Sequence, residues 1–169
     1  MRMHNKPILA LAGTAMAAAT VLTGVTAASA SPGSPRPGVS GTEHFQIVNG
    51  SPTSSKASFI GTGVFTAGGI DLTGQRSDTI KVAGGTFKIN HSQGHGKQSF
   101  NPRTCVFRLS LRGKYTVTGG TGKFAGISGH GTYLLTVLAI GPKVRGKCSM
   151  TKAPLAQQQE IQASGPVRL

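Results

Sequence analysis

Short runs of alternating apolar and polar residues fill the chain from Thr42 onward, and turn residues separate these runs. Side chains on a strand point alternately to its two faces, so a period of two predicts β-strands. Many short strands separated by Gly, Asn and Pro are typical of an all-β sandwich or barrel. Exposed sheet edges can pair with other chains unless charged residues prevent it, and this chain has few charges. A closed sheet has no exposed edges, so closure suits this chain. We therefore expect residues 42–169 to form an all-β domain, an antiparallel closed barrel of about eight strands.

The alternation also assigns residues to the two faces of each strand. In residues 105–114 the odd positions are apolar, whereas the even positions include Arg108, Arg112 and Lys114. One face of this strand is expected to contact the core, and the other to be basic. Residues 133–140 are apolar at nearly every position, so we expect this strand to be the most buried one.

Composition adds a strongly basic character to this picture. The 169 residues include 18 Lys and Arg but only 4 Asp and Glu, which gives a formal net charge of +14. Charged residues make up only 13% of the chain, which excludes a charge-rich disordered chain and a solvated coiled coil. The 25 glycines lack the every-third spacing of collagen. A weakly charged, basic globular domain is the class that remains.

The N-terminus has the pattern of a secretory signal peptide over residues 1–30. Arg2 and Lys6 precede an apolar stretch at 8–25, and a small-x-small cleavage site follows at 28–30. A transmembrane anchor is the alternative, but the low Leu, Ile and Phe content of the stretch argues against it. Residues 31–41 are rich in Pro and Gly and predict a disordered lead-in. We expect a secreted, extracellular protein that does not span a membrane after cleavage.

The sequence has two cysteines, Cys105 and Cys148, and both follow the predicted cleavage site. An oxidising compartment makes a Cys105–Cys148 disulfide the default expectation. A catalytic thiol and a metal ligand are the alternatives, and neither cysteine has partner residues at a recognisable spacing.

Residues 115–133 (YTVTGGTGKFAGISGHGTY) resemble a pattern of the allene oxide cyclases and dirigent proteins, in which a strand leads into Gly-Gly-Thr-Gly-x-Phe and a return strand. Residues 63–67 (GVFTA) and 84–89 (GGTFKI) are similar to secreted bacterial members of this group. The resemblance covers about residues 42–169 and implies a calycin- or dirigent-like barrel with a central cavity and the potential to form a homo-oligomer. The resemblance does not imply the catalytic activity of the plant enzymes, because their cavity carboxylate cannot be aligned with a residue of this sequence.

Two polar residues extend apolar strand faces, where a barrel cavity would open. Glu43 shares the face of Phe45 and Ile47, and His91 continues the face of residues 87–89. A carboxylate at such a position would be desolvated and its pKa raised, which suits acid–base chemistry. With Tyr133 as a third polar group, Glu43 and His91 are the predicted ligand-binding residues and the candidate catalytic ones. The alternative is that these strand ends simply face solvent.

No motif in the sequence indicates a metal or a cofactor. The segment 119–123 (GGTGK) lacks the spacing of a phosphate-binding loop and has no helix after it, so we interpret it as a tight turn. His91, His95 and His130 lack carboxylate or thiolate support for a zinc site. We expect no metal and no cofactor.

The basic residues point to an anionic partner. Without Arg2 and Lys6 the mature chain keeps 16 Lys and Arg, and its field attracts anions. Anionic envelope polymers fit this charge better than nucleic acids, because no aromatic residues for base stacking are interleaved with the cations. A soluble basic surface without a partner is the alternative. The residues expected to form this surface are Arg108, Arg112, Lys114, Lys143, Arg145, Lys147 and Lys152.

Three functions follow as hypotheses. The first is a barrel that holds an apolar small molecule or a reactive intermediate in its cavity. The second is an isomerase or cyclase of the allene oxide cyclase or dirigent type, with Glu43 or His91 as acid or base. The third is a basic envelope or structural protein that uses its outer face.

Overall fold

The computed structural model describes residues 38–51 and 53–169. The predicted signal peptide and residues 31–37 of the predicted lead-in lie outside the described residues. The first strand already begins at Ser40, so the end of the predicted lead-in belongs to the sheet. Within the described ranges, no helix has the length and apolar character needed to cross a membrane.

Apart from one short 3₁₀ turn, η1 (Gly122–Phe124), the described elements are strands. The glycine-rich segment 119–123, which was predicted to be a tight turn, leads from the end of the preceding strand into this 3₁₀ turn, and Gly119 and Gly122 adopt positive φ. The strands are β1 (Ser40–Asn49), β2 (Lys56–Thr62), β3 (Ala67–Leu72), β4 (Ser77–Val82), β5 (Gly85–His91), β6 (His95–Asn101), β7 (Val106–Gly120), β8 (Ser128–Ile140), β9 (Lys143–Val144), β10 (Lys147–Cys148) and β11 (Ala156–Arg168).

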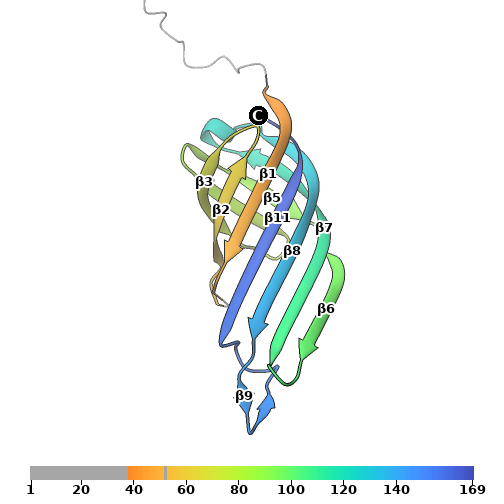
Figure 1. Cartoon of the computed structure of the whole chain (residues 1–169). Helices are drawn as coiled ribbons and strands as arrows, with labels where there is room; N and C mark the ends of the chain where they lie inside the picture. The colour runs from red at the N-terminus through yellow and green to blue at the C-terminus, as the bar shows by residue number, and fades with distance from the viewer. Residues whose placement is uncertain (1–37, 52) are drawn as a thin grey trace, which may run out of the picture. The chain divides into compact units, whose positions relative to one another are not determined.

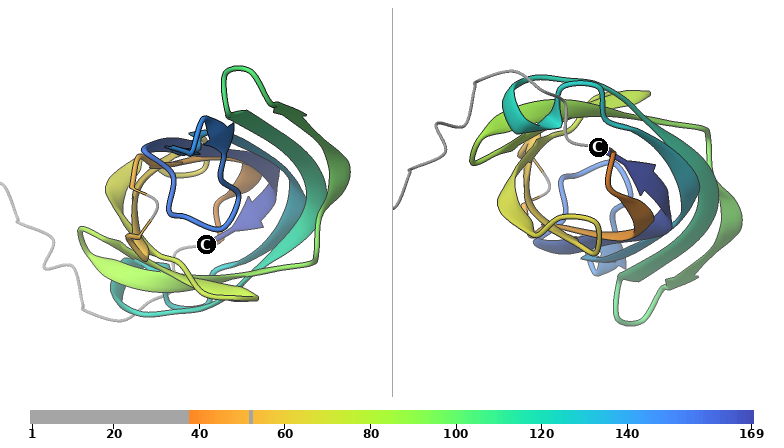
Figure 2. Two further views of the ribbon diagram at one scale, coloured as in Figure 1. Left: turned by 90° about the horizontal axis from the view of Figure 1, so that it is seen from below. Right: turned by 90° about the horizontal axis from the view of Figure 1, so that it is seen from above.

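Eight of these strands close into an antiparallel barrel (Figures 1 and 2). Their order around the barrel is β5-β4-β3-β2-β1-β11-β8-β7, and a pairing between β7 and β5 completes the ring. The predicted closed barrel of about eight strands is therefore confirmed. A ninth strand, β6, pairs with β7 outside the ring, and β9 and β10 form a separate small hairpin.

The long strand β7 changes partner midway along its length. Its residues 115–120 pair with β5, whereas residues 106–112 pair with β6. The sheet β6-β7-β8-β11 therefore continues below the closed part of the barrel (Figure 1). Cys105, just before β7, forms the predicted disulfide with Cys148 of β10.

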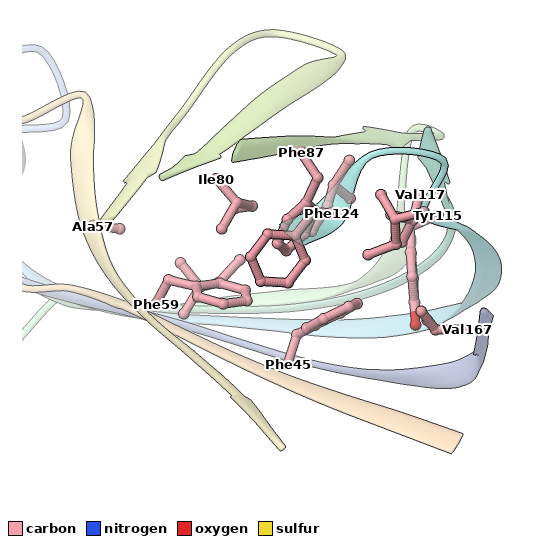
Figure 3. Packing of buried hydrophobic residues seen from close by; sticks show 12 residues of the cluster. Phe45, Ala57, Phe59, Ile80, Phe87, Tyr115, Val117, Phe124 and Val167 are labelled. Carbon is pink, nitrogen blue, oxygen red and sulfur yellow. The ribbon is translucent and has the colours of Figure 1, made fainter. Parts of the chain in front are cut away.

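Aromatic rings fill the closed part of the barrel (Figure 3). Phe87 lies at the centre of this cluster, with four phenylalanine rings at centroid distances of 5.3–6.2 Å. Phe59 and Ile80 are almost completely buried beside it. The upper barrel is thus packed solid, which provides a rigid frame for the polar residues below.

The prediction that residues 133–140 form the most buried strand was wrong. Leu138 and Ile140 of β8 are 39% and 41% exposed, and of the residues in this range only Ala139 is buried. The barrel wall is a single layer, so one side of β8 faces solvent although it carries leucines. Apolar character on both faces indicates burial only where a second layer covers the sheet.

Two tyrosines pack across glycines on the inner wall. Tyr133 is the cross-strand partner of Gly113, and Tyr115 is the partner of Gly131. A Cβ at Gly113 would lie 2.5 Å from the Tyr133 ring, which is far inside van der Waals contact. Glycine at this position therefore allows the ring to lie flat across β7.

We expect Gly113→Ala to lower the free energy of unfolding by about 1–3 kcal/mol, because the methyl group must displace the Tyr133 ring. Gly68→Ala on β3 is the matched control, since a Cβ there has no heavy atom within 4 Å. Urea unfolding of both variants measures the effect. Equal losses would mean that the Tyr133 contact imposes no constraint.

Candidate functional site

Most of the acidic side chains of the protein point into the barrel. Of the four Asp and Glu in the sequence, Glu43, Asp71 and Asp78 are buried. They lie on β1, β3 and β4 respectively, on the inward-facing parity of each strand. Burying a carboxylate is costly unless it is paired or protonated, so these three residues mark where chemistry can occur.

Glu43 lies at the upper end of the core. Its carboxylate reaches over Gly61 and Gly63, where a Cβ would lie only 3.0–3.1 Å from the carboxylate oxygens. The Phe65 N–H donates to Oε2 at 3.1 Å, while Oε1 has no hydrogen-bond partner among the described residues. Burial raises the pKa of Glu43, and the N–H groups of Phe65 and Val64 partly oppose this.

Tyr115 is buried in the same region as Glu43. Its hydroxyl has no hydrogen-bond partner in the described part of the chain. Burial, and then the charge of Glu43, raise the pKa of Tyr115 to about 12. The phenol therefore stays protonated and can donate a hydrogen bond, but it cannot serve as a base near neutral pH.

Asp71 and Asp78 form a buried acidic pair on neighbouring strands. Asp78 accepts a hydrogen bond from the Gly74 N–H at 2.8 Å, whereas both oxygens of Asp71 lack a partner among the residues described. Burial, and then the charge of Asp78, raise the pKa of Asp71 to about 7. Asp71 therefore carries a proton at mildly acidic pH.

His91 connects this acidic pair to the interior space. Its Nε2 lies 3.5 Å from Oδ2 of Asp78, and about a quarter of its side chain is exposed. The ring of Tyr133 lies edge-on to the imidazole at a centroid distance of 6.3 Å. The Tyr133 hydroxyl donates a hydrogen bond to the Ser92 carbonyl at 2.8 Å, just after the end of β5. Burial raises the pKa of Tyr133.

A cavity of about 130 Å³ lies below the phenylalanine cluster. Its polar wall consists of Asp78, His91 and Tyr133, together with the Tyr115 ring. The rest of the lining is mostly aliphatic, with Thr73 and Gln159 as further polar residues, so the cavity combines a largely apolar wall with a few polar groups. The aliphatic lining residues are Ile47, Ile89, Leu135, Ile161 and Ala163.

Apolar side chains continue from this cavity along the inner face of the lower sheet, and we call this apolar face the trough. Leu135 belongs to both, and its neighbours in register are Leu111 on β7 and Ile161 on β11. The segment 141–155, tied to Cys105 by the disulfide, lies below β7 and β8 and crosses the opening when seen from below (Figure 2). The trough residues, half-buried except for the more exposed Phe100, are Phe100, Phe107, Leu109, Leu111, Leu135 and Val137.

The structure brings together two of the three residues predicted to bind a ligand. His91 and Tyr133 line the cavity, whereas Glu43 is not among its lining residues. The rise in the pKa of Glu43 agrees with the predicted effect of desolvation. The sequence interpretation did not assign Asp71, Asp78 or Tyr115 to the site. Their positions on otherwise apolar parities, such as Asp78 with Ile80, were the available signal.

The predicted basic residues lie outside this interior site. All seven are exposed: Arg108, Arg112, Lys114, Lys143, Arg145, Lys147 and Lys152. His95 and His130 are exposed as well, so His91 is the one member of the histidine trio that lines the cavity. Within residues 38–51 and 53–169, no group of three His, Cys, Asp or Glu side chains is arranged to hold a metal ion.

Fold and site together define a class: an eight-stranded antiparallel barrel with a small apolar cavity and a carboxylate–imidazole–phenol wall. Comparisons of the chain with protein-family models, curated proteins and solved structures found no match. The resemblance to allene oxide cyclases and dirigent proteins therefore remains a prediction.

Proposed function

We propose that this protein is a secreted barrel that binds a small molecule with an apolar body and one polar group. The apolar body would lie against Leu135 and Ile161, and the polar group would meet His91 and Tyr133. The observation that carries the proposal is the cavity itself, whose mostly aliphatic lining includes a few polar groups. The Cys105–Cys148 disulfide is consistent with an extracellular location.

The dimensions of the interior limit the ligand. A cavity of 130 Å³ is similar to the engineered cavities of about 150 Å³ that hold benzene. Most ligand pockets are larger, roughly 300–1,000 Å³. A ligand of ordinary size would therefore place its polar end in the cavity and extend its apolar body along the trough.

The polar wall also limits the chemistry of the ligand. Asp78 beside His91 makes the site unfavourable for a second carboxylate. The imidazole can donate or accept one hydrogen bond, and the Tyr133 hydroxyl can accept one while donating to Ser92. A neutral carbonyl or hydroxyl group suits these partners, so we propose a carbonyl or alcohol compound with an apolar body.

Binding can be tested with N-phenyl-1-naphthylamine, a neutral apolar probe whose fluorescence rises in apolar surroundings. Leu135→Trp fills the cavity, and Leu134→Trp places the same ring on the outer face of the same strand. We expect one binding site per chain, weakened about tenfold or more by Leu135→Trp and unchanged by Leu134→Trp. Because the chain has no other tryptophan, energy transfer from the new indole reports the position of the probe.

Absence of probe binding to the wild-type protein, or equal binding by both tryptophan variants, would contradict the proposal. Thermal melting of each variant separates a lost site from a lost fold. Native mass spectrometry of the purified protein adds the mass of any molecule that the barrel retains.

As a second candidate, we propose that the same site isomerises its ligand by proton transfer. The contact between Asp78 and His91 favours this candidate, because a carboxylate beside an imidazole holds the ring in a fixed orientation for proton transfer. His91→Gln should then abolish conversion of a bound ligand while its binding persists. Glu43→Gln should leave conversion unchanged, because Glu43 does not line the cavity.

A further inference from the structure

The charges of this protein are divided between the inside and the outside of the barrel. The described residues contain 15 Lys and Arg, and every one of them is exposed. Glu160 is the one Asp or Glu that is not buried. In the described part of the chain, no lysine or arginine forms a salt bridge, so these cations are available to an external anion.

One outer face concentrates part of this charge in a regular array. In Figure 1, β1, β11, β8, β7 and β6 lie side by side, and the outward side chains of β7 include Arg108, Arg112 and Lys114. Arg108 and Arg112 are separated by four residues, or about 14 Å along an extended strand. On β6, Lys97 pairs in register with Ser110, midway between the two arginines. The cations thus form a row of three on β7, with Lys97 of β6 beside it.

Beside this row, Thr132 and Thr136 alternate with Leu134 and Leu138 on the outer side of β8, and the outward positions of β11 carry the amides of Gln158 and Gln162 and the hydroxyl of Ser164. Two shallow grooves cross the face, of about 940 and 640 Å³. Arg112 and Lys114 line the first groove with Thr132 and Gln162. The second groove is lined by Lys97, Arg108, Thr136 and Gln158, among others.

The Glu160 carboxylate on this face already accepts hydrogen bonds from neighbouring side chains. Oε1 of Glu160 accepts hydrogen bonds from Nε2 of Gln46 at 3.2 Å and from Nε2 of Gln162 at 2.7 Å. Glu160 therefore contributes one negative charge to the face while its hydrogen bonds hold two glutamines in place. The face remains positive beside an ordered strip of amides.

We propose that the face formed by β6, β7, β8 and β11 binds an acidic polysaccharide. The staggered Lys and Arg residues would pair with carboxylate or sulfate groups, and Arg can do so with two parallel hydrogen bonds. The neighbouring Thr and Gln side chains can donate to and accept from sugar hydroxyls. This surface is separate from the interior cavity, so it does not depend on the ligand proposed above.

The composition of the face favours a glycan over single-stranded nucleic acid. The outward positions of β6, β7, β8 and β11, all within the described residues, contain no phenylalanine or tyrosine. Proteins that bind single strands rely on aromatic rings for base stacking. Sugar hydroxyls, in contrast, match the hydroxyl and amide side chains that line the two grooves together with the cations.

The test measures binding of heparin, an acidic polysaccharide, to two variants of equal charge. The first replaces Lys97, Arg108, Arg112 and Lys114 by Gln, and the second replaces Lys56, Lys81, Lys88 and Lys123 by Gln elsewhere on the barrel. Each loses four positive charges from exposed positions, so both should fold. We expect the first to weaken binding about tenfold or more and to flatten its salt dependence, with a loss of about threefold or less in the second.

A second comparison separates a glycan site from simple charge attraction. Thr136→Ala/Gln162→Ala removes a hydroxyl and an amide from the face without changing its charge. This variant should weaken heparin binding about threefold or more and leave binding of inorganic polyphosphate unchanged. Equal losses in the two charge variants would overturn the proposed face. No effect of Thr136→Ala/Gln162→Ala on heparin binding would overturn the proposed specificity for a glycan.

Discussion

Replacing Cys105 and Cys148 together by serine is expected to lower the free energy of unfolding by about 4 kcal/mol. The disulfide joins residues that are 43 positions apart in the sequence. It restricts the unfolded chain, and its loss therefore increases the entropy gained on unfolding. Small domains are stable by only about 5–15 kcal/mol, so this loss is a large share of the total.

Chemical denaturation under oxidising conditions, with the wild-type protein beside the double variant, measures this effect. Ser149→Ala is a local control, because Ser149 lies next to Cys148 and makes only local side-chain contacts with Thr151 and Lys152. The wild-type protein in a reducing buffer should approach the stability of the double variant. A loss below about 1 kcal/mol would show that the disulfide contributes little constraint.

The free energy of unfolding is also expected to fall as the pH rises from about 4 to about 7, because of Asp71. Its pKa is about 7 in the folded barrel, against an ordinary value of 3.8. Below the ordinary value the group is protonated in both states, so its cost to folding is absent. As the pH rises from the ordinary value to the folded pKa, Asp71 ionises in the unfolded chain but not in the barrel, so the unfolded state gains stability. At about 1.4 kcal/mol for each pH unit between the two values, the cost reaches about 4 kcal/mol above pH 7.

Asp71→Asn tests this expectation because it removes the ionisation at the same position. The variant should show a flatter dependence of unfolding free energy on pH between 4 and 8, and a relative gain at pH 8. Glu43 acts in the same direction, so part of the slope should remain. Glu160→Gln on the outer face is the control and should leave the slope unchanged. A wild-type profile that is flat over this range would contradict the buried charge at Asp71.

The period-two pattern determined much of this fold in advance. It identified the inward face of β7, the inward positions of Glu43 and His91, and the turn at η1. These predictions succeed because side-chain alternation and turn chemistry are local properties of the chain. The pairing of Cys105 with Cys148 followed from compartment and number rather than from spacing, and the structure confirms it.

Other features depend on the pairing of strands that are distant in the sequence. The period-two pattern contains no information about this pairing. The switch of β7 from β5 to β6 opens the trough, and no residue in β7 signals it. The depth of Glu43 depends on the close approach of the turn at Gly63. The pairing of Asp78 with His91 joins β4 to β5 across the ladder. Packing between distant segments decided each of these features.

The burial of acidic side chains changes the net charge of the folded protein in solution. Near pH 5.5 the unfolded chain would ionise Asp71, whereas the folded barrel keeps it protonated. Folding is therefore coupled to proton uptake, and the native protein migrates in an electric field as a stronger cation than its composition implies. The barrel buries three of its four Asp and Glu side chains and keeps Asp71 protonated, which leaves the exposed positive charges to determine how other molecules first encounter it.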